Sequence, residues 1–313
     1  MIENHFMLTT EGLYRSYNKQ NRFEPTVYRL WNEGLGRYFN ESFTRKLGVH
    51  ALEKARDEET IVMLAEYFRP SDYMRMLETR LFHFALTDEY SSKERNDREE
   101  DRIRLLASMK ALIAGVHRMH RSQKIVLPKV GRSFSYNTLL MLHGEAPDTL
   151  EEHALDALLC AYIPVHVHRD DDSSRSIDSQ HLISSAVSHW RKLENDRRFG
   201  RILRKMVSEV EGELTRSLPS NIGFTNVHDH RCGALEHFAF ELGKQRNDIT
   251  LYKAAKKLEL HYEKQGLYPC LDYYAALLMY NLRIPTELFA PVVCLSKISG
   301  WLGSQAKNEE YLV

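Results

Sequence analysis

The chain has 313 residues, of which 43% are apolar and 27% are charged, as in a globular protein with one large domain or two modest ones. Its 43 basic and 43 acidic residues cancel, which argues against nucleic-acid binding because phosphate needs clusters of uncompensated Lys and Arg. No apolar run is long enough for a membrane span, and no targeting pattern is visible. The four cysteines have no paired spacing, which disfavours disulfides or a cysteine-based zinc site and predicts a cytoplasmic protein.

The first half of the chain contains polar runs and one clear helical segment. The mixed-charge run Ser91–Arg104 predicts a solvated loop. Leu105–Val116 repeats apolar residues at helical spacing and predicts a helix. Lys124–Val130 and Ile163–His168 are the two strand candidates, and the polar stretch Arg169–Ser179 predicts another loop.

The second half begins with a loop and continues as helices. Ser217–His230 contains proline and glycine and lacks helical periodicity, so it predicts a loop. Apolar periodicity predicts helices over Leu235–Leu242, Leu251–Tyr262 and Tyr273–Tyr280, and Pro285 marks the point where one helix ends and another can begin. Gly and Pro are too few for the many tight turns of a sandwich or barrel. The sequence therefore predicts an all-α fold with at most a small hairpin.

Two pairs of closely spaced histidines are the first candidates for chemistry. His166 and His168 form one pair, and His228 and His230 form the other. On an extended segment, side chains two residues apart point to the same side, so converging pairs could hold a divalent metal ion. The chain has 15 histidines, so such pairs arise readily by chance, and a metal site is the less favoured interpretation.

Three charged residues at or within helices are the second group of candidates. Asp272 begins an apolar helix, where it can either interact with the helix dipole or act as a base in apolar surroundings. Arg231 opens another helix and is either a surface arginine or a clamp for a carboxylate. Lys297 lies in the apolar run Leu288–Leu302, where a lone cation either extends to solvent or holds an anion.

Read in chain order, these segments resemble the citrate synthase family. Residues 266–305, GLYPCLDYYAALLMYNLRIPTELFAPVVCLSKISGWLGSQ, are similar to the family's closing signature almost without a gap. The resemblance implies a mostly helical homodimer with a large domain, residues 1–189 and 268–313, a shortened small domain, residues 190–267, and a site in the cleft. Weaker similarities in the same order lie at Tyr14–Tyr17, Phe23–Trp31, Tyr136–Pro147, His181–Ser188, Gly223–Phe224 and Asp229–Leu242.

The resemblance also implies roles for the three charged residues. The family joins an acyl-CoA to the carbonyl of a 2-keto acid, using a carboxylate to remove a proton from the acyl group. Asp272 falls on the catalytic aspartate, and Arg231 falls on the arginine of the family's D-P-R, a ligand of the substrate carboxylate. Lys297 replaces a second substrate arginine, and because lysine lacks the planar fork we expect a weaker clamp.

Three departures from the family imply altered chemistry. The family's H-x-x-H-x-x-N-x-S-T reads YIPVHVHRDDD here, residues 162–172, so His166 or His168 could serve as the acid. Asn226 stands where G-F-G-H-R has its carbonyl-polarising histidine, and His228 could replace that histidine. Asn226 and His230 are expected to bind the substrate, and His230 could also serve as a donor. Nothing resembles G-P-L-H-G-G-A-N, which in the family helps bind CoA, so a CoA thioester is possible without its usual binding segment.

From the matches and the departures together, we expect enolisation of a small carboxylated or acyl-thioester substrate, followed by formation or cleavage of a carbon–carbon bond. Ordinary citrate synthesis is not expected, because the CoA-binding segment is missing. The alternative is a catalytically silent binding or scaffolding protein with the same fold.

Overall fold

The computed structural model describes residues 22–32, 38–86, 95–163, 198–211 and 222–310. Within them the chain is almost entirely helical, which confirms the predicted all-α fold. The helices are α2 (Phe23–Trp31), α3 (Glu41–Arg56), α4 (Glu58–Tyr67), α5 (Tyr73–Leu86), α6 (Arg95–His120), α7 (Phe134–His143), α8 (Thr149–Tyr162), α10 (Arg198–Glu211), α11 (Cys232–Gln245), α12 (Thr250–Glu263), α13 (Leu271–Asn281) and α14 (Phe289–Glu310). Short 3₁₀ helices η2 (Pro70–Asp72) and η4 (Thr286–Leu288) and strands β1 (Phe224–Thr225) and β2 (Tyr268–Pro269) accompany them.

The predicted helices lie where the apolar periodicity puts them. Leu105–Val116 falls inside α6, and the three later segments fall inside α11, α12 and α13. Pro285 separates α13 from η4, which leads directly into α14. None of the helices in the described ranges is long and apolar enough to cross a membrane.

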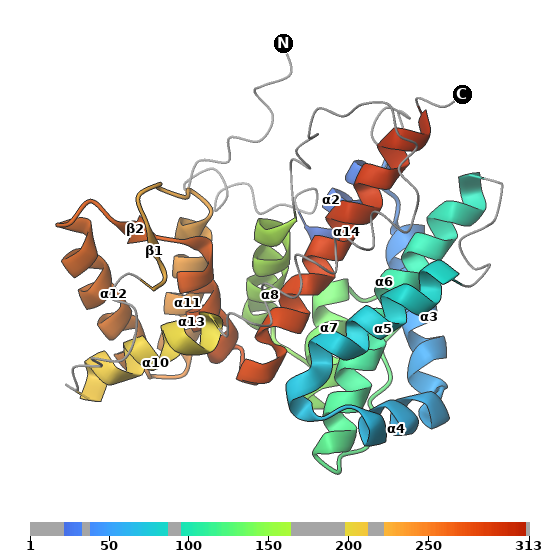
Figure 1. Ribbon diagram of the computed structural model, residues 1–313, viewed down its shortest axis with the longest axis horizontal. Coiled ribbons are helices and arrows are strands. Elements are labelled where there is room, and N and C mark those ends of the chain that lie inside the picture. The colour runs from blue at the N-terminus through green and yellow to red at the C-terminus, as the bar shows by residue number, and fades with distance from the viewer. Residues whose placement is uncertain (1–21, 33–37, 87–94, 164–197, 212–221, 311–313) are drawn as a thin grey trace.

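The elements form two groups with α8 between them in the view of Figure 1. On one side, α10 to α13 and the β1–β2 pair pack together, and on the other, α3 to α7 pack together. Helix α8 packs against α11 and α13 of the first group and against α7 of the second, so it joins both groups, and it also packs against α14. The predicted large domain, residues 1–189 and 268–313, includes α13, yet α13 packs chiefly against α10 and α11. The division at residues 190 and 267 stays a prediction.

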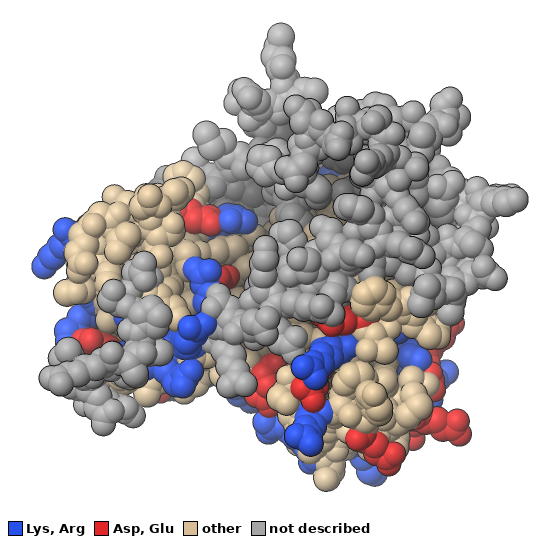
Figure 2. Space-filling model, viewed as in Figure 1, with Lys and Arg blue, Asp and Glu red and all other residues tan. Residues whose placement is uncertain are grey.

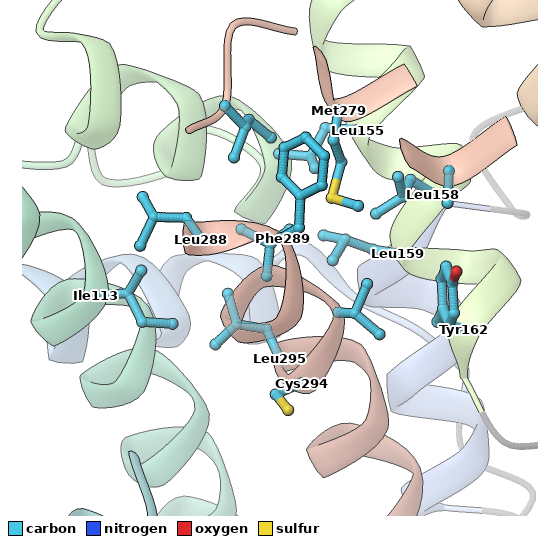
Figure 3. Close-up of a cluster of buried hydrophobic side chains, with 14 of the residues drawn as sticks. Ile113, Leu155, Leu158, Leu159, Tyr162, Met279, Leu288, Phe289, Cys294 and Leu295 are labelled. Carbon is cyan, nitrogen blue, oxygen red and sulfur yellow. The ribbon is translucent and has the colours of Figure 1, made fainter. Parts of the chain in front are cut away.

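Helix α14 packs against α8, and its residues 289–302 are mostly apolar and buried on nearly all sides. Figure 3 shows its side chains Leu295 and Cys294 in one cluster with Leu159 and Tyr162 of α8. The hydroxyl of Ser296 donates a hydrogen bond to the carbonyl of Leu159. This contact holds the last turn of α8 against the middle of α14.

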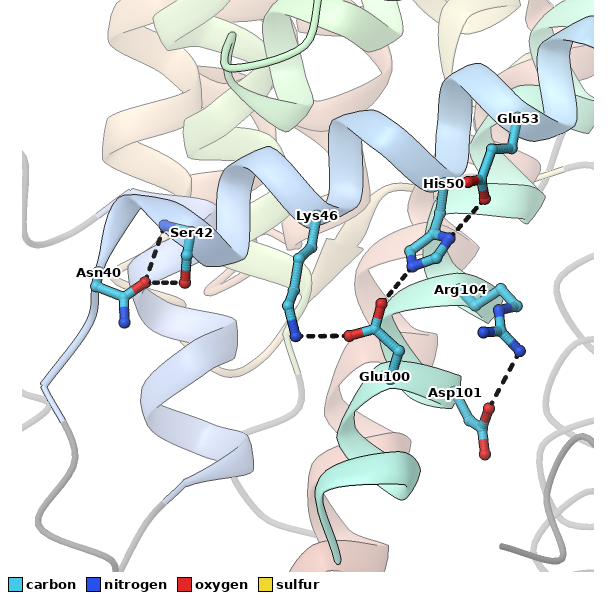
Figure 4. A network of polar contacts seen from close by, with 8 residues as sticks. All are labelled: Asn40, Ser42, Lys46, His50, Glu53, Glu100, Asp101 and Arg104. Atoms are coloured by element: carbon cyan, nitrogen blue, oxygen red, sulfur yellow. Dashed lines mark hydrogen bonds and ion pairs between the residues drawn. The ribbon is translucent and has the colours of Figure 1, made fainter.

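The predicted loop at Ser91–Arg104 is wrong from Arg95 onward, because α6 begins there. Glu100 in that stretch accepts bonds from Lys46 Nζ at 2.6 Å and lies 2.5 Å from His50 Nε2, both on α3 (Figure 4). Arg and Glu are good helix formers, and charged residues at helical spacing support one another once a partner helix lies alongside. The mixed-charge run therefore forms the start of a helix that docks on α3 and buries Asp101 and Arg102, rather than a solvated loop.

The predicted strand at Lys124–Val130 is also wrong, because side chains take the hydrogen bonds that a strand partner would need. Arg118 Nε donates to the carbonyl of Lys124 at 2.5 Å. The amide of Asn137 accepts from the backbone N–H of Lys129 at 2.8 Å and donates to its carbonyl at 3.1 Å. Of the other strand candidate, only Ile163 lies in the described residues, and the loop predicted at Arg169–Ser179 lies outside them.

The predicted loop Ser217–His230 contains one strand instead. Within its described part, Phe224 and Thr225 pair antiparallel with Pro269 and Tyr268. Two-residue strands carry too little alternation to be recognised from the sequence. The four cysteines are free, as their spacing predicted.

Candidate active site

The β1–β2 pair sets the start of two helices side by side. Gly223 precedes β1 with φ of +86°, and a Cβ there would lie 2.8 Å from Cδ2 of Tyr273, so only glycine fits without strain. Its carbonyl accepts a hydrogen bond from the N–H of Cys270, 2.9 Å away, just before α13. The thiol of Cys232, at the start of α11, bonds the carbonyl of Pro269. Asp272 and Arg231 are thereby brought to neighbouring helix ends.

Asp272 lies in the first turn of α13, but its carboxylate is bound by side chains of other helices. Oδ1 accepts a hydrogen bond of 2.5 Å from the hydroxyl of Tyr162, the last residue of α8. Oδ2 lies 3.1 Å from Nε of Arg198, the first residue of α10. The carboxylate side chain is 18% exposed, so it is sheltered but not closed off from solvent. Asp272 is therefore neither a simple helix cap nor a fully solvated carboxylate.

Tyr162 and Arg198 are site residues that the sequence reasoning missed. Burial, and then the negative charge of Asp272, raise the pKa of the Tyr162 hydroxyl far above its usual value, so it keeps its proton and acts as a donor. Arg198 also donates from its second nitrogen to the sulfur of Cys270 at 3.2 Å. Tyr162 is the first residue of the stretch that replaces the family's histidine motif, but nothing in the sequence connects it or Arg198 with Asp272. Only the packing of α8 and α10 against α13 reveals these contacts.

Lys and Arg side chains gather on the surface near this carboxylate. Figure 2 shows a column of them over the part of the view that Figure 1 gives to α10. Helix α10 starts with Arg198 and also carries the partly exposed Arg201 and the exposed Arg204, whereas its Lys205 is buried and bonds the hydroxyl of Tyr262. A positive surface beside the start of α13 favours the approach of small anions.

Arg231 lies at the start of α11 and is held by its own chain. Its Nε and its second terminal nitrogen bind the two oxygens of Asp229 at 2.9 and 2.6 Å, as a bidentate pair. The remaining terminal nitrogen donates to the carbonyl of Ala161 at 2.9 Å. The hydrogen bonds that Arg231 donates to Asp229 raise the pKa of Arg231. Burial raises the pKa of Asp229, but the same hydrogen bonds outweigh it and lower that pKa. A substrate carboxylate would have to share this guanidinium with Asp229.

Lys297 is half-buried in a stretch of α14 that is otherwise buried from residue 291 to 300. Its Nζ lies 6.0 Å from the centre of the Tyr162 ring. Among the described residues no carboxylate forms an ion pair with it. Lys297 therefore brings a positive charge to the same end of α8 that Asp272 and Arg231 contact.

The structure does not place the predicted histidines His228 and His230, or Asn226, in contact with Asp272. The rings of His228 and His230 lie 5.1 Å apart, and His228 also lies 5.5 Å from the ring of Tyr268. Both histidines and Asn226 are exposed, and no hydrogen bond or ion pair joins them to Asp272. The other predicted pair, His166 and His168, lies outside the described residues.

No group of three or more potential metal ligands comes together in the described parts of the chain. The pair His228 and His230, with Asp229 between them, does not make such a group there. A metal site formed by both histidine pairs depends on residues outside the described ranges and remains a prediction.

Comparison with known families and proteins identifies the relationship of the whole chain. The family model for citrate synthase, C-terminal domain, matches residues 9–190 and 224–310. A citrate/2-methylcitrate synthase of Bacillus subtilis is 27% identical over 280 residues, 83% of this chain and 74% of that protein. A citrate synthase of Haloferax volcanii is 25% identical over 316 residues, 92% of this chain and 82% of that protein.

Solved structures show the same fold. The citrate synthase of Pyrobaculum aerophilum matches with a TM-score of 0.72 and 19% identity, over 97% of this chain and 81% of that one. The ternary complex of carboxymethyl coenzyme A and oxaloacetate with citrate synthase from Thermoplasma acidophilum matches with a TM-score of 0.71 and 16% identity, over 97% and 84%. Because the family model covers most of the chain, the protein belongs to the citrate synthase family.

Proposed function

We propose that the protein enolises a small carbonyl compound that carries a carboxylate or a thioester, and forms or cleaves a carbon–carbon bond at the enolised carbon. Asp272 is the base that removes the proton next to the carbonyl. Lys297 and Arg231 attract the substrate's carboxylate. In a reaction of this class, a carboxylate removes the proton from carbon, and nearby positive groups or hydrogen-bond donors stabilise the negative charge that develops on the carbonyl oxygen.

The observation that supports this proposal is the meeting of three helix segments at the last turn of α8. Asp272 binds the Tyr162 hydroxyl, Lys297 lies over the Tyr162 ring, and Arg231 bonds the carbonyl of Ala161. These residues are far apart in the sequence, so their proximity is a property of the fold. A carboxylate that served only the helix dipole would not need two side-chain partners from other helices.

Two features support a reaction other than ordinary citrate synthesis. The family model leaves residues 191–223 unmatched. In this part of the chain nothing resembles the family's glycine-rich segment G-P-L-H-G-G-A-N. Asn226 replaces the histidine of the family's G-F-G-H-R and is exposed here. The substrate that we propose therefore relies less on contacts between the protein and CoA than the substrates of citrate synthases do. The free cysteines and the family resemblance support a cytoplasmic homodimer.

Deuterium exchange tests this function directly. The protein is incubated in deuterated water with pyruvate, 2-oxobutyrate, oxaloacetate, acetyl-CoA or propionyl-CoA, and loss of the proton signal next to the carbonyl is followed by NMR. We expect exchange with at least one compound and a loss of about 1,000-fold or more in Asp272→Asn. Asp248→Asn is the matched control, because Asp248 accepts the N–H of Thr250 before another helix, α12. Absence of exchange with every compound would overturn the proposal.

A catalytically silent binding protein is the second candidate, and one observation favours it. Arg231 and Asp272 both have partners from their own chain, so neither group requires a ligand to satisfy it. Under this alternative, carboxylates raise the melting temperature without proton exchange, because binding to the native state alone stabilises it.

A further inference from the structure

Tyr162, the first residue of the stretch that replaces the family's histidine motif, is in contact with both Asp272 and Lys297. Its hydroxyl donates to Oδ1 of Asp272 at 2.5 Å, and its ring lies beneath Nζ of Lys297. It ends α8 and is 8% exposed, packed at the edge of the apolar cluster shown in Figure 3. Packing therefore fixes the direction of the side chain, so that the hydroxyl reaches Asp272 and the ring faces Lys297.

The two oxygens of Asp272 have different neighbours, and this separates their roles. Oδ2 faces the permanent charge of Arg198, which stays in place whatever proton Asp272 carries. Oδ1 faces a neutral hydroxyl, whose bond is strong only while the carboxylate is charged. Protonation of Asp272 therefore weakens the bond from Tyr162 more than it disturbs the aspartate's position.

The neutral hydrogen-bond donor on Asp272 is the Tyr162 hydroxyl, and no histidine in the described part of the chain is bonded to that carboxylate. An enolate oxygen needs a hydrogen-bond donor placed beforehand, and a protonated tyrosine can provide one. Tyr162 keeps its proton, because burial and the charge of Asp272 raise its pKa. It is also the donor nearest to the base, since it already touches it.

We propose that Tyr162 is the donor that stabilises the enolate oxygen, an inference that rests on the proposed function of Asp272. The bond between hydrogen and the substrate's α-carbon breaks, and the proton bonds to the carboxylate of Asp272. The electron pair forms the carbon–carbon double bond, and the carbonyl electrons move to the oxygen. Asp272 is then neutral, so the Tyr162 hydroxyl turns its hydrogen bond from Oδ1 to the newly charged oxygen. No proton leaves Tyr162, and the reverse step returns the proton, or a deuteron, to carbon.

The test compares exchange in the full-length protein and in three variants. Tyr162→Phe removes only the hydroxyl, and we expect exchange to slow by about 100-fold, the usual cost of losing one oxyanion donor. Tyr162→His restores a ring donor, so we expect part of the rate to return. Tyr252→Phe is the matched control, because the Tyr252 hydroxyl also donates to a carboxylate, Glu236, at 3.0 Å but lies on α12; we expect it to leave the rate unchanged.

A second readout separates catalysis from structure. The rise in melting temperature caused by pyruvate or oxaloacetate should be the same in Tyr162→Phe as in the unaltered protein, because Tyr162 does not hold the carboxylate. Full exchange in Tyr162→Phe would overturn the role of Tyr162 and leave the proposed function standing. Absence of exchange in the unaltered protein would overturn both. Should Tyr162→Phe fail to fold, exchange in Tyr162→His no faster than in Asp272→Asn would overturn the role of Tyr162 alone.

Discussion

Two regions of the molecule set a carboxylate near a cation, and they differ in how much solvent the charges keep. At the candidate site, the side chains of Asp272 and Arg198 are 18% and 38% exposed, and they form an ion pair. In the large helical group, Glu24 of α2 and Lys110 of α6 are 2% and 1% exposed. The first pair remains open to a ligand, whereas the second pair is sealed in the core.

The sealed pair is poorly bonded. Nζ of Lys110 lies 4.1 Å from the centre of the Phe134 ring and has no hydrogen-bond partner among the described residues. Glu24 accepts a 2.5 Å bond from the N–H of Phe134. Burial lowers the pKa of Lys110 to about 7 and raises the pKa of Glu24. Complete burial therefore makes a charge pair costly and sensitive to pH, while partial exposure with several partners leaves it available for chemistry.

Removing the carboxylate of the sealed pair should have the largest effect on stability. We expect Glu24→Ala to lower the free energy of unfolding by about 3–5 kcal/mol at about pH 6, because Lys110 is then a buried charge without a counter-charge. Urea unfolding measures it. Glu24→Gln, which keeps an acceptor for the N–H of Phe134, should cost less. Equal stability of Glu24→Ala and the unaltered protein would show that the pair does not interact.

The pH dependence of stability should report Lys110 separately. Its pKa is about 7 in the folded protein and 10.5 ordinarily, so between these values the unfolded chain binds more protons. Stability therefore rises with pH across this window, by up to about 1.4 kcal/mol per pH unit from this group. We expect Lys110→Met to remove this slope in urea unfolding followed from neutral to alkaline pH. Parallel curves for the two proteins would contradict the burial of a titrating lysine.

The buried apolar helices could be predicted from the sequence, whereas a charged helix could not. Apolar periodicity and Pro285 placed α11 to α14 correctly, because these helices bury one face or nearly all of their surface. Charge composition failed at Ser91–Arg104, since a solvated loop and a helix docked through Lys46, His50 and Glu100 have the same composition. Apolar periodicity shows which face of a helix is buried in the core. It does not show that a charged face packs against another helix, as the start of α6 does against α3.

The candidate site was predictable only in part. The resemblance pointed to Asp272, Arg231 and Lys297, and these three do gather at one end of α8. Tyr162 and Arg198 could not be found this way, because each reaches Asp272 only through the packing of its helix. A contact between residues 110 positions apart leaves no local pattern in the sequence.

The exposed pair at the site should matter more for chemistry than for stability. We expect Arg198→Ala to change the free energy of unfolding by less than about 1 kcal/mol, because a half-exposed ion pair contributes little. Proton exchange should slow by about tenfold, since Oδ2 of Asp272 loses the group that holds it. Lys257→Ala, which breaks an exposed ion pair with Glu209, is the control and should leave exchange unchanged. An equal effect of both variants on exchange would contradict a positioning role for Arg198.

Lys297 should give the smallest effect. Lys297→Arg restores a planar fork, so we expect a carboxylate to bind about fivefold more tightly. Lys297→Met should weaken binding by a similar factor. Calorimetric titration with pyruvate and oxaloacetate measures both variants. Identical affinities in the two variants would place the bound carboxylate away from Lys297.

The most direct measurement of the central claim is a crystal structure of the protein with a bound 2-keto acid. The account predicts that the ligand's carboxylate lies within hydrogen-bonding distance of Lys297 or Arg231, with its α-carbon facing Asp272 and its keto oxygen facing Tyr162. A ligand bound in another part of the molecule, with Asp272 still bonded only to Tyr162 and Arg198, would contradict the account.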